Sequence, residues 1–281
     1  MSKPVPDTNH PDMWLEAWPW PDSDSHKHAR GALGCVTGSA SATGAARLAA
    51  RAGLRTGAGL ATLFSPPGAV LVNAIHETAV MVKAFRDADE LASLSATCAC
   101  TIIGPGAGVT EETRENTLSV LDNSETSVLD ADAFTVFKDD PQALFGAIKT
   151  PVLTTPHPGE FKRLFPGLLE EHGRKAAAMI AAERSGAVVI LKGAQSVIAA
   201  PDGRVVLNDH ATPFLATAGS GDVLAGIAGG LMAQGMEVFG AACAACWAHG
   251  DTGLRVGPGL IAEDLPEVLP EVLQELHAKR A

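Results

Sequence analysis

Short apolar runs alternate with longer stretches of helical periodicity from Gly34 onward. The apolar runs predict strands at 33–37, 61–65, 78–82, 100–104, 127–131, 152–155 and 187–193. Helical stretches such as 42–57 and 170–186 lie between them. Strands that alternate with helices are typical of βα units around a parallel sheet. We therefore predict an α/β fold with a mostly parallel central sheet and helices on both faces.

The last third of the chain has a different pattern. The segment 196–208 predicts a hairpin that turns at Asp202 and Gly203. Helical stretches follow at 220–235, 237–253 and 263–280. Because no internal linker interrupts the pattern, residues 31–281 are expected to form one domain.

Residues 1–30 show no sustained period and carry Trp14, Trp18 and Trp20 among several prolines. Such a segment has little chance of building its own core, so we predict an irregular arm. The tryptophans are expected to anchor this arm on the main body or on a neighbouring subunit.

Composition narrows the class of protein. The chain has 281 residues, 46% of them hydrophobic, and 29 glycines, which is typical of a globular fold with many tight turns. The formal net charge of -11 argues against general binding to nucleic acid, which needs clustered Lys and Arg. No apolar run reaches membrane-spanning length and the N-terminus lacks a signal-peptide core, so no membrane association and a cytoplasmic location are expected.

The five cysteines, at 35, 98, 100, 243 and 246, suggest no disulfide framework, and we expect buried reduced thiols. Cys243 and Cys246 form a CxxC with His249 three residues further on. Tetrahedral zinc would need more ligands from elsewhere, and the surrounding residues are small. A packed helix is the favoured interpretation, and a metal site is the alternative.

Two glycine-rich segments could approach an anion closely. Gly104, Gly106 and Gly108 form a strand-to-helix turn, although tight packing alone explains many such turns. In the second segment, 215–226, backbone donors of Gly219, Ser220 and Gly221 could bind a nucleotide phosphate at a helix N-terminus.

Asp222 follows the second segment in the first turn of that predicted helix. A carboxylate beside a phosphate-binding loop can accept a proton from an attacking hydroxyl. The alternative is a carboxylate that only caps the helix. The adjacent glycines favour the catalytic role.

Other polar residues follow the predicted strands. Glu160 could hold Mg²⁺ directly or through water, or could simply occupy the first turn of a helix. Asp130 and Asp132 could reach metal or substrate, or cap a helix. Lys192 and Gly193 end another strand, where the backbone could line a nucleotide pocket.

Taken in order, several motifs resemble those of the ADP- or ATP-dependent NAD(P)H-hydrate dehydratases, members of the ribokinase-like superfamily. They are GCVTGS, TGAARLAA, RTGAGL, GPGAG, VLDADAF, TPHPGEF, LKGAQSVIAAPDG, LATAGSGDVLAGIAGGLMAQG and IAEDL, and they run from about His26 to near the C-terminus. The resemblance implies a ribokinase-like catalytic domain. It also implies a hydro-lyase that repairs NADHX and NADPHX, in which ADP yields AMP and phosphate, or ATP yields ADP and phosphate.

Site residues carry over by matching position. The resemblance implies that the hydrate contacts Ala45, Gly104, Gly106, Gly108, His157 and Asp222, with Asp222 as the base. It implies nucleotide contacts at Lys192, Gly193, Ala194, Gln195, Ser196 and Gly221.

The chain also departs from the family pattern. Ala42, Ala218 and Ser220 replace the commoner Tyr, Gly and Thr, which puts contacts at the substrate's edge in doubt but not the reaction. Many relatives carry an epimerase domain, for which this chain has no room, so a separate NAD(P)HX epimerase is expected to act in the same pathway. The family commonly forms homotetramers.

Two other functions stay open. A ribokinase-like kinase acting on a hydroxymethylpyrimidine or a hydroxyethylthiazole would release its phosphorylated product intact, but the TPHPGEF motif favours the dehydratase. A nucleotide-binding regulator without catalysis would be favoured by the loss of Asp222, which is present.

Overall fold

A nine-stranded sheet forms the centre of the protein in a computed structural model that describes residues 7–280. The strands are β1 (Ala32–Val36), β2 (Leu60–Ser65), β3 (Met81–Ala84), β4 (Cys100–Ile103), β5 (Thr126–Leu129), β6 (Val152–Thr154), β7 (Val188–Leu191), β8 (Ser196–Ala199) and β9 (Val205–Asn208). Their order is β3-β2-β1-β4-β5-β6-β7-β8-β9. The pairs from β3 to β7 are parallel, and β8 and β9 are antiparallel to their neighbours. The predicted mostly parallel α/β sheet is confirmed.

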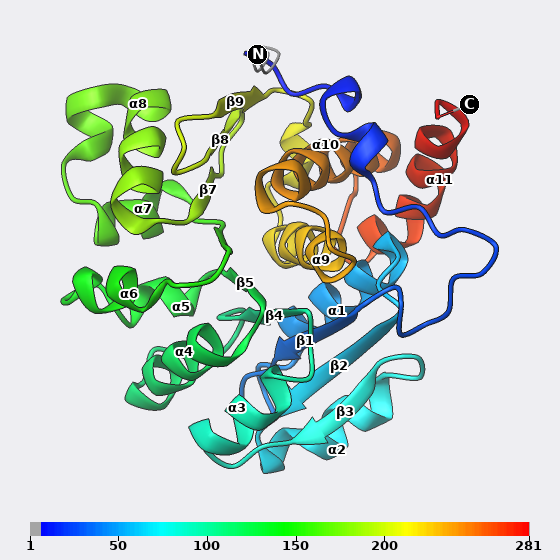
Figure 1. Cartoon of the computed structure of the whole chain (residues 1–281), viewed down its shortest axis with the longest axis vertical. Coiled ribbons are helices and arrows are strands. Elements are labelled where there is room, and N and C mark those ends of the chain that lie inside the picture. The colour runs from blue at the N-terminus through cyan, green and yellow to red at the C-terminus, as the bar shows by residue number, and fades with distance from the viewer. Residues whose placement is uncertain (1–6, 281) are drawn as a thin grey trace.

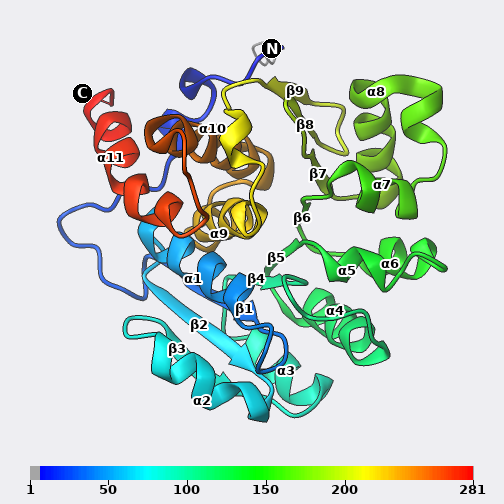
Figure 2. The ribbon, with the colours of Figure 1, turned by 180° about the vertical axis from the view of Figure 1, so that it is seen from behind.

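Helices cover both faces of this sheet (Figures 1 and 2). The helices are α1 (Gly44–Thr56), α2 (Pro67–His76), α3 (Ala88–Ser95), α4 (Glu111–Asn123), α5 (Asp132–Thr135), α6 (Pro141–Ala147), α7 (Pro158–Leu164), α8 (Leu168–Ser185), α9 (Ser220–Ala233), α10 (Val238–Val256) and α11 (Asp264–Ala278). Short 3₁₀ turns are η1 (Pro11–Met13), η2 (Leu15–Ala17) and η3 (Pro213–Leu215). The figures place α1, α9, α10 and α11 on one side of the sheet and α3 to α8 along the other.

Alternation of side chains along the strands explains the two covered faces. In β4, Ile102 packs in the core under α1, α9, α10 and α11, whereas Ile103 packs in the core under α3 to α8. Val128 and Leu129 of β5 divide in the same way. Successive strand side chains point to opposite faces, so continuous apolar runs bury both.

The edge strand differs from its prediction. The sequence predicts a strand at 78–82, but β3 begins at Met81 and ends at Ala84. Among the described residues it pairs with β2 alone, with Thr62 opposite Met81 and Ser65 opposite Ala84. This pairing, and not the apolar run, fixes where an exposed edge strand begins. By contrast, the predicted hairpin at 196–208 is confirmed, with Gly203 at φ 91° in its turn.

The N-terminal arm lies along α10 of the same chain (Figure 1). Trp14 and Trp18 are buried, and the rings of Trp14 and Trp247 are 5.9 Å apart. Asn9 Nδ2 donates to the carbonyl oxygen of Cys243 over 2.7 Å. Apolar burial and a buried polar contact together hold this irregular segment.

All five cysteines are buried free thiols, and Cys243 and Cys246 lie inside α10. The packed-helix prediction for the CxxC is therefore confirmed. Within residues 7–280, none of the helices combines the length and hydropathy that a bilayer crossing needs.

Candidate functional site

The predicted motifs gather at the carboxyl edge of the sheet. Strands β4 to β7 run parallel, so the segments that follow them meet at one edge. The turn 104–108 follows β4, Asp130 follows β5, 155–160 follows β6 and Lys192 follows β7. Open α/β sheets place their ligand crevices there.

An ion pair lies at the centre of this edge. Lys192 Nζ is 2.9 Å from Asp130 Oδ1, and the Asp130 side chain is only 2% exposed. Burial alone would lower the pKa of Lys192, but the carboxylates of Asp130, Glu160 and Asp222 together raise it. Lys192 is thus a charged donor near neutral pH.

Asp222 has the most informative environment in the site. It lies in the first turn of α9, whose N-cap is Gly219 at φ 87°, and no side chain caps this helix. Burial, then repulsion by Asp130, raises the pKa of Asp222 to about 7 against the opposing effect of Lys192. A carboxylate whose pKa lies near neutrality is suited to general-base work and is not explained by capping.

Gly221 allows close approach to the ion pair. A Cβ at this position would lie 3.2 Å from Lys192 Nζ and 4.0 Å from Asp130 Oδ2. The first turn of α9 therefore faces the ammonium across a gap that a side chain would fill. Backbone N–H groups and an ammonium around one small space make a site for phosphate.

The turn 104–108 is shaped by packing as well as by conformation. Gly104, Gly106 and Gly108 have φ values of 118°, 67° and 86°, which favour glycine. A Cβ on Gly104 would overlap the carbonyl oxygen of Asp130, and one on Gly106 would lie 2.7 Å from the carbonyl oxygen of Ala42. The turn thus lies between Asp130 and the segment that leads into α1, where Ala45 is half-buried.

A strained backbone residue separates Asp130 from Asp132 in the VLDADAF segment. Ala131 has φ 49°, which is unusual for alanine and costs about 1–3 kcal/mol. On one side Asp130 pairs with Lys192, and on the other Asp132 Oδ2 accepts a hydrogen bond from Gly108 N over 2.8 Å. The turn at Ala131 directs both carboxylates to the site, and Asp132 holds the glycine turn.

His157 and Glu160 form a capping box at the start of α7. His157 Nδ1 accepts from the backbone N–H groups of Gly159 and Glu160, so its proton is on Nε2. Glu160 Oε2 accepts from His157 N over 2.8 Å, and Oε1 is 3.3 Å from His157 Nε2. Glu160 therefore has the structural role that the sequence left open, while its carboxylate still acts on Lys192.

A pocket of about 670 Å³ opens beside Lys192. Of the predicted nucleotide contacts, Lys192, Gly193, Ala194, Ser196, Ser220 and Gly221 line it. The other side is formed by the loop 211–217 and by Leu224, Cys246, His249 and Gly250 of α9 and α10. The volume suits a nucleotide-sized ligand.

Two contributors to this pocket were missed from the sequence. Arg174 Nη2 donates to the carbonyl oxygens of Leu191, Lys192 and Gln195 and so shapes the loop after β7. A glycine inside a predicted helix was the available sequence signal for a bend at this point. Gly173, at φ 70° and ψ 171°, kinks α8 just before Arg174. His249, in the same pocket, was considered only as a metal ligand.

Negative side chains outnumber positive ones around Lys192. Three carboxylates, those of Asp130, Glu160 and Asp222, act on the single ammonium of Lys192. Across residues 7–280, no group of three or more His, Cys, Asp or Glu residues has an arrangement that could hold a metal ion.

Comparisons with known proteins agree on one family. The family model described as NAD(P)H-hydrate dehydratase matches residues 33–274. An ADP-dependent (S)-NAD(P)H-hydrate dehydratase from Xanthomonas campestris is 35% identical, over 93% of this chain and 94% of the relative. A bifunctional NAD(P)H-hydrate repair enzyme from Moorella thermoacetica is 37% identical over 91% of this chain and 52% of the relative. The chain spans about half the length of such bifunctional relatives.

Solved structures agree with the sequence relatives. An ADP/ATP-dependent NAD(P)H-hydrate dehydratase from Bacillus subtilis, co-crystallised with ATP and Mg²⁺, has a TM-score of 0.85 at 28% identity and covers 98% of this chain and 100% of its own. A ribokinase-like superfamily protein from Enterococcus faecalis has a TM-score of 0.83 at 24% identity, over 95% of both chains. The predicted ribokinase-like fold is confirmed.

Proposed function

Because the chain belongs to the NAD(P)H-hydrate dehydratase family, we propose that it restores NADHX and NADPHX to NADH and NADPH at the expense of ADP or ATP. The observation that carries this proposal is the position of Asp222. Its carboxylate, whose pKa burial raises to about 7, lies close enough to Asp130 and Lys192 for both charges to act on it. Gly221, directly before it, leaves the space beside Lys192 Nζ open. A base beside a phosphate site is what phosphorylation of a hydroxyl requires.

The reaction proceeds in two steps. Asp222 accepts the proton of the hydrate's hydroxyl while that oxygen attacks the terminal phosphorus of the nucleotide, and the bond to the departing AMP or ADP breaks. The carbon–oxygen bond then breaks with help from the ring nitrogen. Phosphate leaves, the neighbouring carbon loses a proton, and the ring double bond is restored. Lys192 and the N-terminus of α9 stabilise negative charge on the transferred group.

The two ligands occupy different sides of Asp222. The nucleotide lies in the 670 Å³ pocket, which is lined by Lys192, Gly193, Ala194, Ser196, Ser220 and Gly221. Gln195 and Gly219 are neighbours of these residues in the chain and complete the proposed nucleotide contacts. The hydrate lies against Ala45, the turn 104–108 and His157. Asp130, whose carboxylate pairs with Lys192, orients the ammonium between the two ligands.

Magnesium would enter this site with the nucleotide. Mg²⁺ is usually bound by one or two carboxylates together with substrate phosphates, and Asp130 and Glu160 supply carboxylate oxygen at the same edge. Both oxygens of Glu160 already contact His157, which favours contact through water. When bound, the ion would neutralise charge on the phosphates.

The partner enzyme, the location and the oligomeric state that we propose follow from the family. A separate epimerase would convert the other hydrate epimer, since the bifunctional relatives are named as repair enzymes with two activities. A cytoplasmic homotetramer remains our expectation.

The proposal is tested by incubating the purified protein with NADHX, Mg²⁺ and each nucleotide in turn. Dihydronicotinamide absorbance should return only when a nucleotide is present, with one AMP formed from ADP for each NADH. Chelation of the metal should slow the recovery. A stable phosphorylated substrate would select the kinase, and conversion without nucleotide would contradict both functions.

A further inference from the structure

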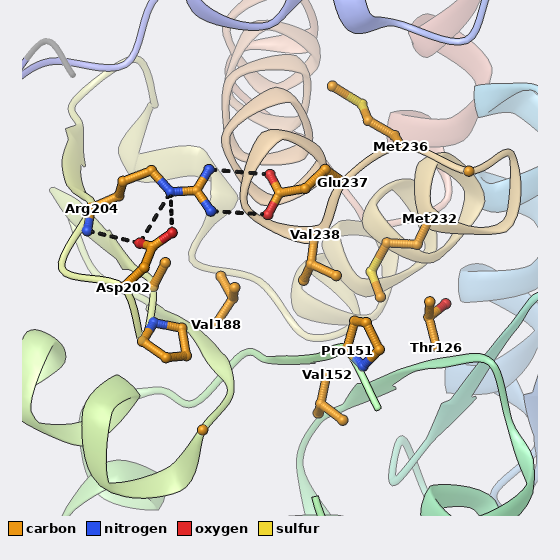
Figure 3. A pocket seen from close by; sticks show the side chains of 14 residues that line it. Thr126, Pro151, Val152, Val188, Asp202, Arg204, Met232, Met236, Glu237 and Val238 are labelled. Atoms are coloured by element: carbon orange, nitrogen blue, oxygen red, sulfur yellow. Dashed lines mark hydrogen bonds and ion pairs between the residues drawn. The ribbon is translucent and has the colours of Figure 1, made fainter. Parts of the chain in front are cut away.

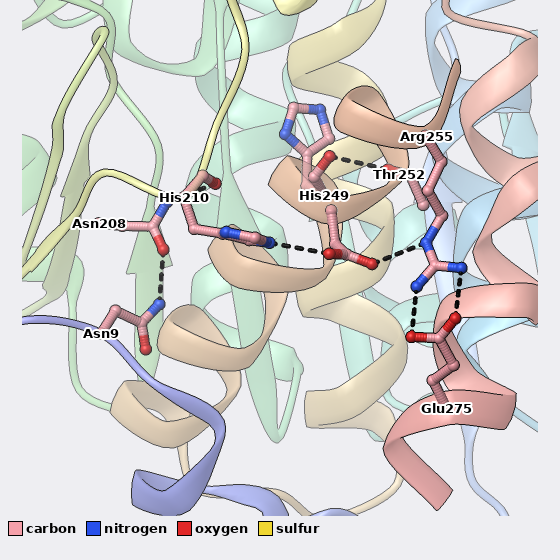
Figure 4. Close-up of polar contacts among 8 residues, drawn as sticks. Asn9, Asn208, His210, His249, Thr252, Arg255 and Glu275 are labelled. Atoms are coloured by element: carbon pink, nitrogen blue, oxygen red, sulfur yellow. Dashed lines mark hydrogen bonds and ion pairs between the residues drawn. The ribbon is translucent and has the colours of Figure 1, made fainter. Parts of the chain in front are cut away.

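His249 is a buried histidine that the proposed reaction does not use. It is 9% exposed, lies on α10 and lines the 670 Å³ pocket. Figure 4 shows it beside a chain of polar contacts, a hydrogen bond from His210 to Asp251 and ion pairs from Asp251 through Arg255 to Glu275, which fixes α10 against the loop before η3 and against α11. The imidazole is therefore held on a rigid support.

The hydrogen bonds of His249 determine where its proton lies. Nε2 is 2.9 Å from the carbonyl oxygen of Ser220 and 3.0 Å from Ser220 Oγ. A carbonyl oxygen can only accept, so Nε2 carries the hydrogen. Burial lowers the pKa of His249 to about 4, so the ring is neutral at physiological pH and Nε2–H is its one ring donor.

This tautomer sets the direction of the Ser220 hydroxyl. Because Nε2 is a donor, Ser220 Oγ accepts from it and cannot donate back. The hydroxyl hydrogen remains available to another acceptor. Ser220 is the first residue of α9, directly before Gly221 and Asp222, and it lines the pocket.

We propose that His249 is a positioning residue for the nucleotide, which holds the Ser220 hydroxyl so that it donates to a phosphate oxygen. The inference rests on the proposed function. In this proposal the side chain at position 220 must donate a hydrogen bond to phosphate, which threonine can do and alanine cannot. The histidine of the CxxC segment thereby also has a role without any metal.

The test measures ADP binding by calorimetry in the absence of hydrate, so that it does not depend on turnover. Ser220→Ala should weaken ADP binding about tenfold, since hydrogen bonds to charged groups are strong. Ser220→Thr keeps the hydroxyl and should stay within about twofold of wild type. His249→Leu should weaken binding as Ser220→Ala does, and His249→Gln, whose amide can donate, should recover part of the loss.

The double variant separates positioning from general stability. If His249 acts through Ser220, Ser220→Ala combined with His249→Leu should bind ADP no more weakly than either single variant. Thr252→Val is the matched control, because Thr252 Oγ1 donates to the His249 carbonyl on the same helix but does not touch the imidazole. It should lower the melting temperature without changing ADP affinity.

Unchanged ADP affinity in folded Ser220→Ala, or fully additive losses in the double variant, would overturn the role of His249. If His249→Leu does not fold, Ser220→Ala and His249→Gln still decide the question. Failure of the wild-type protein to bind any adenine nucleotide would instead contradict the proposed function itself.

Discussion

Each of the two edges of the sheet carries a pocket. The charged side chains are paired at one edge and unbalanced at the other. The pocket at the amino edge, about 480 Å³, is lined by Met232, Met236 and Val188 among other apolar side chains (Figure 3). Its charged residues are paired: Arg204 contacts Asp202 at 2.8 Å and Glu237 at 3.1 Å. At the carboxyl edge, three carboxylates share one ammonium.

The pKa values record this difference. Burial would raise the pKa of Glu237, but hydrogen bonds from Arg204 and from the first turn of α10 hold it below its usual range. Burial and repulsion raise the pKa of Asp222 to about 7. Paired charges stabilise a fold, whereas unbalanced charges in a cleft indicate chemistry. The amino edge is thus structural and the carboxyl edge is the candidate active site.

The largest expected effect is on turnover. Asp222→Asn keeps the shape of the side chain and removes its basicity, so turnover of NADHX should fall roughly 10²- to 10⁴-fold. Nucleotide affinity should stay within a few-fold. Glu237→Gln at the other edge is the control and should leave turnover unchanged. Near-normal turnover in folded Asp222→Asn would leave the reaction without its base.

Gly221→Val should weaken nucleotide binding by about tenfold or more, because its side chain would fill the space beside Lys192 where phosphate is expected. Calorimetry with ADP measures the effect. Gly146→Val is the control, since a Cβ there meets nothing within 4 Å. Equal ADP affinity in folded Gly221→Val and wild type would show that phosphate binds elsewhere.

The pH profile should also distinguish the edges. If Asp222 is the base, kcat/KM should rise with pH through about 7. Asp130→Asn removes a like charge and leaves Lys192 facing Asp222, so the acid limb should move down by roughly one unit. Asp202→Asn should not move it. An acid limb that stays at the same pH in Asp130→Asn would contradict the coupling.

Stability should change in opposite directions at the two edges. The folded pKa of Asp222, about 7, lies above its ordinary value of 3.8, so stability is lost progressively as the pH rises between these two values, and the full loss is present above about pH 7. Asp222→Asn should therefore raise the melting temperature by roughly 2–6 °C at about pH 8, with no gain below the ordinary pKa. Glu237, whose pKa is lowered, should stabilise at about pH 8, so Glu237→Gln should lower the melting temperature slightly. Melting curves across pH that move in the same direction for both variants would contradict this contrast.

Local pattern predicted most of the framework. Buried strands such as β4 and β7 are continuous apolar runs, because helices cover both faces. The exposed edge strand β3 was misplaced, since its position depends on pairing with β2. The glycines and acidic residues of the candidate site could be proposed from the sequence because each directly follows a strand or begins a helix.

Long-range contacts could not be predicted in this way. Arg174 reaches the loop after β7 from α8, and His249 reaches Ser220 from α10, 29 positions along the chain. Gly173 marks the kink before Arg174 but does not indicate the loop that Arg174 reaches. No spacing in the sequence signals the contact between His249 and Ser220. At Asp222 the adjacent glycines favoured catalysis over capping, but the burial of its carboxylate and the charge of Asp130, which bear on this choice, are not visible in the sequence.

The most direct test of the account follows the hydroxyl oxygen of the substrate. NADHX carrying a heavy-oxygen label in that hydroxyl is converted with unlabelled ADP, and the phosphate and water are examined by mass spectrometry. If the hydroxyl attacks phosphorus at the carboxyl edge, the label must leave with the phosphate, one labelled oxygen for each NADH formed. Label found in water, with unlabelled phosphate, would show that dehydration and nucleotide cleavage are separate events and would contradict the role assigned to Asp222.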